Sequence, residues 1–211
     1  MQFPTSALAL ITLLVSFPLA MHAQNVPNDY MIKQNSDPKR LLEVYSANGK
    51  VAYRFTKTAH VPSQGQSMIT VADGSLQKVF SMVTGLDDCS YKTNLAQVEG
   101  PTPKDQLPKR LYKFDERKLW QNSVWRFNVY SDSAGARVYY KFKKNRTNKG
   151  GQIFRVAANQ RSQLVGLLRS QTRKDKWLDP VKGTDTFTLS SVDGAPVTEL
   201  ATLLYLVFTQ C

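Results

Sequence analysis

The last residues of this chain, ELATLLYLVFTQC, constrain its fold more than any other segment. Pro196 suits the first position of a helix, and Glu199 in the first turn suits the helix dipole. Beyond Glu199 the apolar side chains cover nearly every direction of a helix, and only a thin stripe of hydroxyl groups interrupts them. A helix that is apolar all round must be covered all round. The sequence therefore predicts a helix whose whole circumference is buried.

Four structures are possible for this segment, three in which something covers a helix and one in which it is a strand. A membrane span needs about 20 residues, and this run is shorter. A glycolipid-anchor signal has an apolar tail of about 10 to 20 residues, and this run reaches only the lower edge of that range. The segment LLYLVFT also has the aromatic and β-branched content of a final strand. We favour the remaining cover, a β-barrel closed around the helix, because it fits both the length and the composition.

Upstream of this tail, short runs of alternating apolar and polar residues indicate strands. In RVYYKFKK, for example, Val138, Tyr140 and Phe142 fall on one face and the basic residues on the other. The segments of this kind are residues 41–46, 50–59, 67–72, 76–83, 124–130, 137–144, 152–158, 163–170 and 185–192. Proline and glycine predict loops over 87–111 and 173–185. Short strands at hairpin spacing predict a mainly-β fold, an antiparallel barrel or sandwich.

The first residues, MQFPTSALALITLLVSFPLAMHA, predict export from the cell. An apolar run from Ala7 to Ala20 is followed by the small residue Ala23 at a cleavage point. This is the pattern of a secretory signal peptide over residues 1–23. Residues 24–211 are then expected to form a single domain, because a chain of this size normally builds one core.

Export sets expectations for the cysteines and for one asparagine. The two cysteines suggest one disulfide, Cys89–Cys211, in an oxidising compartment. Asn145 begins an N-glycosylation sequon, NRT. No transmembrane segment is expected once the signal peptide has been cleaved.

The charge of the chain predicts an anionic partner. Lys and Arg number 28 against 16 Asp and Glu, which gives a formal net charge of +12. Such a surplus attracts phospholipid headgroups, acidic glycans and nucleic acids. The expected anion-binding residues cluster near one hairpin end and a later basic stretch: Lys141, Lys143, Lys144, Arg146, Arg169, Arg173 and Lys174.

Strands followed by a terminal apolar helix resemble the tubby C-terminal-like domain, a fold shared by phospholipid scramblases and plant LURP-one-related proteins. The likeness covers most of the chain from about Tyr30 to Cys211. It is carried by VYSANGKVAYRF, TVADGSLQKVFSMV, RFNVYSDSAGARVYYKF and DTFTLSSVDGAPVTELATLLYLVF. In that family the helix threads through a twelve-stranded barrel. The resemblance therefore implies a closed antiparallel β-barrel of about twelve strands around a buried C-terminal α-helix.

One local match implies a site. Tubby proteins bind phosphoinositide headgroups with a Lys and an Arg in the pattern K-x-R-S-N-x-x-G-x-x-F, and KNRTNKGGQIF is similar to it. Lys144 and Arg146 stand at the two cationic positions, and Thr147 replaces the serine. A lysine point charge and a forked guanidinium two residues apart can share one phosphate. The resemblance implies an anion site at this pair.

Few residues are available for catalysis. After removal of the signal peptide, His60 is the only histidine, and no G-x-S-x-G motif accompanies it. One histidine and two distant cysteines cannot supply the four ligands of zinc, and no nucleotide-binding glycine motif is present. We therefore expect a secreted binding protein without metal, cofactor or catalysis. The alternatives are a secreted hydrolase that uses His60 with a carboxylate, and nonspecific nucleic-acid binding around outward-facing Tyr139.

Overall fold

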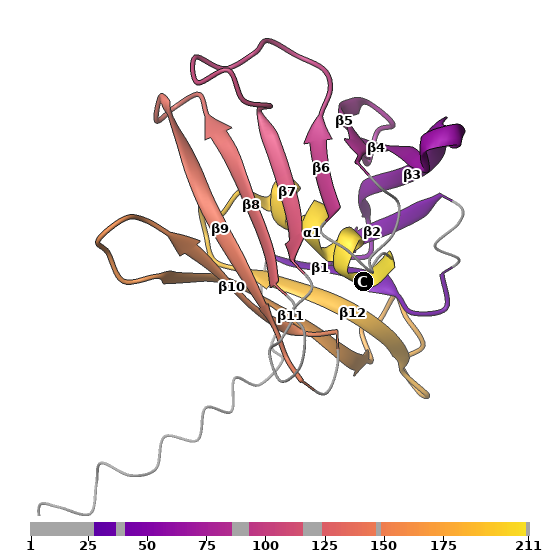
Figure 1. The fold of residues 1–211 in the computed structure, drawn as a ribbon. Helices are drawn as coiled ribbons and strands as arrows, with labels where there is room; N and C mark the ends of the chain where they lie inside the picture. Colours follow the sequence, from indigo (N-terminus) through magenta and orange to yellow (C-terminus); the bar gives the residue numbers. More distant parts are fainter. Residues whose placement is uncertain (1–27, 37–40, 86–92, 116–123, 147–148, 210–211) are drawn as a thin grey trace, which may run out of the picture.

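The computed structural model describes residues 28–36, 41–85, 93–115, 124–146 and 149–209. In these residues twelve strands form a closed barrel, and every neighbouring pair is antiparallel (Figure 1). Consecutive strands are neighbours throughout, and β1 closes the barrel against β12. The predicted fold class, a closed antiparallel β-barrel with a C-terminal helix, is confirmed.

More than half of the described residues lie in the strands of the barrel wall. The strands are β1 (Asp29–Lys33), β2 (Leu42–Ser46), β3 (Val51–Val61), β4 (Gln66–Asp73), β5 (Lys78–Thr84), β6 (Thr93–Gln97), β7 (Arg110–Asp115), β8 (Val124–Ser131), β9 (Ala136–Lys144), β10 (Gly151–Val156), β11 (Gln163–Arg173) and β12 (Thr184–Ser191). The short 3-10 turn η1 (Pro62–Gln64) joins β3 to β4, and the helix α1 (Val197–Thr209) follows β12.

The helix α1 is part of the barrel's hydrophobic core. Every residue from Glu199 to Val207 is buried. Inward-facing side chains of the strands surround it, and the ring of Phe55 stacks on the ring of Tyr205 with 4.5 Å between the centroids. The barrel is therefore the cover of the apolar tail, and the alternative of a final strand in this segment is wrong.

Polar groups on the helix find partners inside the barrel. Thr202 Oγ1 donates a hydrogen bond to the carbonyl of Thr198 at 2.8 Å, so this hydroxyl is satisfied within the helix. The Tyr112 hydroxyl donates to the carbonyl of Glu199 at 3.0 Å. Burial raises the pKa of Tyr112 well above its usual value. This phenol therefore stays neutral, and its hydrogen bond ties the first helical turn to β7.

Three strands were missing from the sequence prediction: β1, β6 and β7. The predicted loop over 87–111 was wrong in its middle and at its end, because it contains β6 and the start of β7. In β6 only Thr93 and Leu95 are buried, so its alternation is too short to be recognised. Pairing with β5 and β7 supplies the backbone hydrogen bonds that hold it. The second predicted loop is confirmed as the connection over 174–183.

Some expectations lie outside the described residues. The signal peptide over 1–23 and both members of the Cys89–Cys211 pair belong to this group, so export and the disulfide stay predictions. Within the described ranges, no helix combines the length and hydropathy that a membrane crossing requires.

Candidate anion-binding surface

Three neighbouring strands form a part of the barrel wall whose sequence holds no acidic residue. No Asp or Glu occurs between Asp132 and Asp175, and this span contains β9, β10 and β11. These strands lie side by side in the barrel. We call residues 136–173 the basic wall. Its Lys and Arg residues are Arg137, Lys141, Lys143, Lys144, Arg146, Lys149, Arg155, Arg161, Arg169 and Arg173. The absence of acids is readable from the sequence, and it is the signal that the sequence prediction missed.

Alternation along β9 divides the wall into an inner and an outer face. Tyr140 and Phe142 are buried, whereas Tyr139 and Lys143 are exposed. The Nζ atom of Lys143 lies 5.1 Å from the ring centroid of Phe154 on β10, within reach of a cation–π contact. The predicted inward set of β9 is confirmed, and the outer face of the wall presents an aromatic ring with lysine beside it.

The turn between β9 and β10 gathers the cations of the predicted hairpin site. Arg146 is exposed, and the backbone N–H of Asn145 donates to the carbonyl of Gly150 at 2.8 Å. A Cβ atom on Gly151 would lie 2.1 Å from the carbonyl oxygen of Lys143, so only glycine fits where β10 begins. The structure therefore brings the ends of the two strands tightly together beneath this turn. Asn145, the predicted glycosylation residue, is exposed there.

Lys149 is a member of this cluster that sequence reasoning missed. Its Nζ donates to the carbonyl of Phe208 at 2.7 Å and lies 5.2 Å from the centroid of the Phe208 ring. It therefore caps the C-terminal end of α1, where a cation is favoured by the helix dipole. Burial and the positive charge of Lys144 lower the pKa of Lys149. Lys144 and Lys149 are thus close enough to repel one another, and an anion bound beside them would relieve that repulsion.

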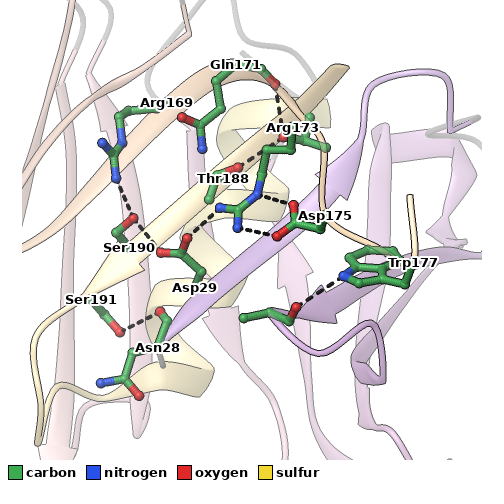
Figure 2. Close-up of polar contacts among 12 residues, drawn as sticks. Asn28, Asp29, Arg169, Gln171, Arg173, Asp175, Trp177, Thr188, Ser190 and Ser191 are labelled. Carbon is green, nitrogen blue, oxygen red and sulfur yellow. Dashed lines mark hydrogen bonds and ion pairs between the residues drawn. The ribbon is translucent and has the colours of Figure 1, made fainter. Parts of the chain in front are cut away.

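Arg169 and Arg173 of β11 are occupied by internal partners (Figure 2). The Nη2 atom of Arg169 donates to Ser190 Oγ at 2.7 Å. Its buried Nε donates no hydrogen bond to any residue that the structure describes. Arg169 therefore adds positive charge to the wall, while much of its guanidinium faces β12 and not a ligand.

Arg173 is the centre of a buried ion network. Its Nε and Nη2 atoms donate to the two oxygens of Asp175 at 2.6 and 2.9 Å, and its Nη1 atom donates to Asp29 (Figure 2). The hydrogen bond from Arg173 lowers the pKa of Asp175. Ser190 Oγ donates to the second oxygen of Asp29 at 2.7 Å. The structure thus pairs Arg173 with two carboxylates, while Lys174 beside it is exposed.

The residues of the two alternative functions, His60 and Tyr139, lie on different strands, β3 and β9. His60 is exposed near the end of β3, and no described carboxylate hydrogen-bonds to it. Within the described ranges, no three His, Cys, Asp or Glu side chains form a group that could hold a metal ion. Tyr139, the residue considered for base stacking, is exposed.

Comparisons of this chain with protein-family models, with curated proteins and with solved structures gave no match. The class of this protein is therefore defined by its fold alone. It is an antiparallel β-barrel with an internal helix and one basic wall. The likeness to tubby domains stays a prediction.

Proposed function

We propose that this protein is a secreted, non-catalytic binding protein that attaches to anionic surfaces through its basic wall. The observation that carries the proposal is the run of three adjacent strands, β9, β10 and β11, without a single acidic residue. Arg137 and Arg173 are paired with carboxylates from outside the span, but no carboxylate within it opposes the other cations, so the face keeps a surplus of positive charge. Such a face draws anions from a distance and concentrates them at the surface.

The turn between β9 and β10 is the proposed contact point, and phospholipid headgroups are the favoured ligand. Lys143 and Lys144 end β9 and Arg146 follows them in the turn, and Lys143 and Arg146 are exposed. A guanidinium binds phosphate oxygens in a fork, and the neighbouring lysines add point charges. Acidic glycans carry the same sign of charge and form the comparison ligand in the test. Lys141 extends the surface along β9.

Sedimentation with lipid vesicles tests the proposal. We expect the parent protein to bind vesicles that contain phosphatidylserine and not vesicles of phosphatidylcholine alone. The double variant Lys144→Glu/Arg146→Glu should bind at least about 30-fold more weakly, because each basic residue at a membrane surface contributes about 1 kcal/mol. Its thermal unfolding should stay close to that of the parent, since exposed substitutions change stability by about 0.5 kcal/mol or less.

The matched control is Lys104→Glu/Lys182→Glu, which changes the net charge equally at two exposed lysines outside the wall. Equal losses in the two variants would show attraction to net charge alone and would contradict the proposed contact point. Binding to acidic glycan beads that is stronger than binding to lipid, and that is lost in Lys144→Glu/Arg146→Glu, would make an acidic glycan the ligand of the wall. His60→Ala should bind as the parent does, whereas loss of a hydrolytic activity in that variant would support the alternative.

A further inference from the structure

A second basic site lies where β11 ends and the connection to β12 begins. Here the connection between β11 and β12 packs against the turn between β2 and β3, and a groove of about 730 Å³ opens between them. Its lining consists of residues 47–48 and 171–177. Grooves of about 300–1,000 Å³ suit small ligands.

Trp177 fixes the two sides of this groove. Its Nε1 donates to the carbonyl of Ala47 at 3.1 Å (Figure 2). Its ring lies on Gly49, where an added Cβ would be 2.6 Å from the indole and where φ is +83°. The ring of Tyr45 lies 5.2 Å away between centroids, and Lys33 Nζ is 5.4 Å from the Trp177 ring. These contacts hold the groove in a preformed shape.

The charge of the groove depends on three consecutive residues, Lys174, Asp175 and Lys176, whose side chains point in different directions. Asp175 turns toward Arg173 and is bound by it through two hydrogen bonds. Lys174 and Lys176 on either side are exposed and line the groove. Neither lysine forms an ion pair with a residue that the structure describes. The one carboxylate of the lining, Asp175, is therefore held by Arg173, which also binds Asp29, and the two lysines are left for a ligand.

The remaining polar groups of the lining suit hydroxyl groups. Asn48 Oδ1 accepts hydrogen bonds from Ser46 Oγ at 2.8 Å and from the backbone N–H of Lys50 at 3.0 Å. This orientation leaves the Asn48 amide N–H groups to donate elsewhere. Gln171 adds a second amide to the lining. Amides bind sugar hydroxyls well because each carries both donors and an acceptor.

We propose that this groove binds an acidic saccharide, a short chain of sugar units that carry carboxylates. Two lysines match the carboxylates, and the amides of Asn48 and Gln171 match the hydroxyls. The one arginine of the lining, Arg173, is occupied by carboxylates, so the two lysines supply the positive charge that a ligand would meet. The groove meets the end of the basic wall at residues 171–173, but its two lysines lie beyond the wall, and it selects its ligand by shape as well as by charge.

Isothermal titration calorimetry with a galacturonic acid trimer tests this proposal, and the methyl ester of the same trimer is the neutral control. The parent protein should bind the free acid and should bind the ester at least about tenfold more weakly, since the ester has lost the charge. Lys174→Gln/Lys176→Gln should weaken binding of the acid by at least about tenfold. Lys104→Gln/Lys182→Gln removes two exposed lysine charges outside the groove and should bind as the parent does.

Three results would overturn the assignment: no binding of the acid to the parent, equal binding of acid and ester, or equal losses in the two double variants. Displacement of the trimer by inorganic phosphate at equal concentration would overturn it as well, because the groove would then hold any anion. Lys144→Glu/Arg146→Glu should retain saccharide binding. Failure at the vesicles and failure at the groove are therefore distinguished by separate variants.

Discussion

Arg110 and Glu199 form an ion pair where α1 enters the barrel. Both side chains are largely buried, and Arg110 Nε lies 2.7 Å from Glu199 Oε1. The same guanidinium donates to Gln97 Oε1 at 2.9 Å and lies 4.3 Å from the centroid of the Phe80 ring. Removing one partner of such a pair leaves a charge in a poorly solvated place, which costs about 3–5 kcal/mol. We expect Glu199→Ala to lower the free energy of unfolding in urea by about this amount.

The double variant Arg110→Met/Glu199→Leu serves as the control for this pair. It leaves no charge unpaired, so it should lose much less stability than the sum of the two single substitutions. Simple additivity of the losses would show that the two side chains act independently, and the ion pair would then have no part in docking the helix.

At the scale of whole elements, the stability of the barrel depends on the side chains of the helix that fill it. Leu204 is fully buried on α1, whereas Leu164 on β11 is 41% exposed. We expect Leu204→Ala to lower the free energy of unfolding by about 2–5 kcal/mol, because it opens a cavity in the core. The same change at Leu164 should cost about 0.5 kcal/mol or less. Urea unfolding curves followed by circular dichroism compare the two.

A stronger test at this scale is a chain that ends at Ala195 and lacks α1. The inward faces of the strands would then surround an empty interior, so we expect no cooperative unfolding transition and no ordered aromatic signal in near-ultraviolet circular dichroism. A compact remainder that unfolds cooperatively would show that the barrel does not need the helix as its core.

At the scale of the whole molecule, binding and stability should respond differently to salt. The formal net charge is +12, while the core is an apolar cluster of strand and helix side chains. Salt shortens the range of surface charge from about 10 Å at 0.1 M to about 3 Å at 1 M. Binding to phosphatidylserine vesicles should therefore fall steeply between these concentrations, while the thermal midpoint changes little. Vesicle binding that persists at 1 M NaCl would point to apolar insertion.

The fold could be predicted where a pattern is local and long. A helix that is apolar on all sides demands a cover, and the alternation in β8 and β9 separates inner from outer side chains within a few residues. Hydrophobic periodicity needs no knowledge of distant partners, so these elements were visible in the sequence. A strand as short as β6 carries too little of that signal, and its neighbours decide its structure.

The candidate sites, like the fold, could be predicted from the sequence only in part. The basic residues of the wall could be read from the sequence, because charge is a property of each residue alone. The sequence did not reveal that Asp29, 144 positions away, would meet Arg173, or that Lys149 would cap the end of α1. Pairings of this kind arise only when the barrel closes and brings distant segments together. The sequence by itself therefore determined the buried helix and the sign of the surface, and the tertiary structure decided which charges are consumed inside and which remain for a ligand.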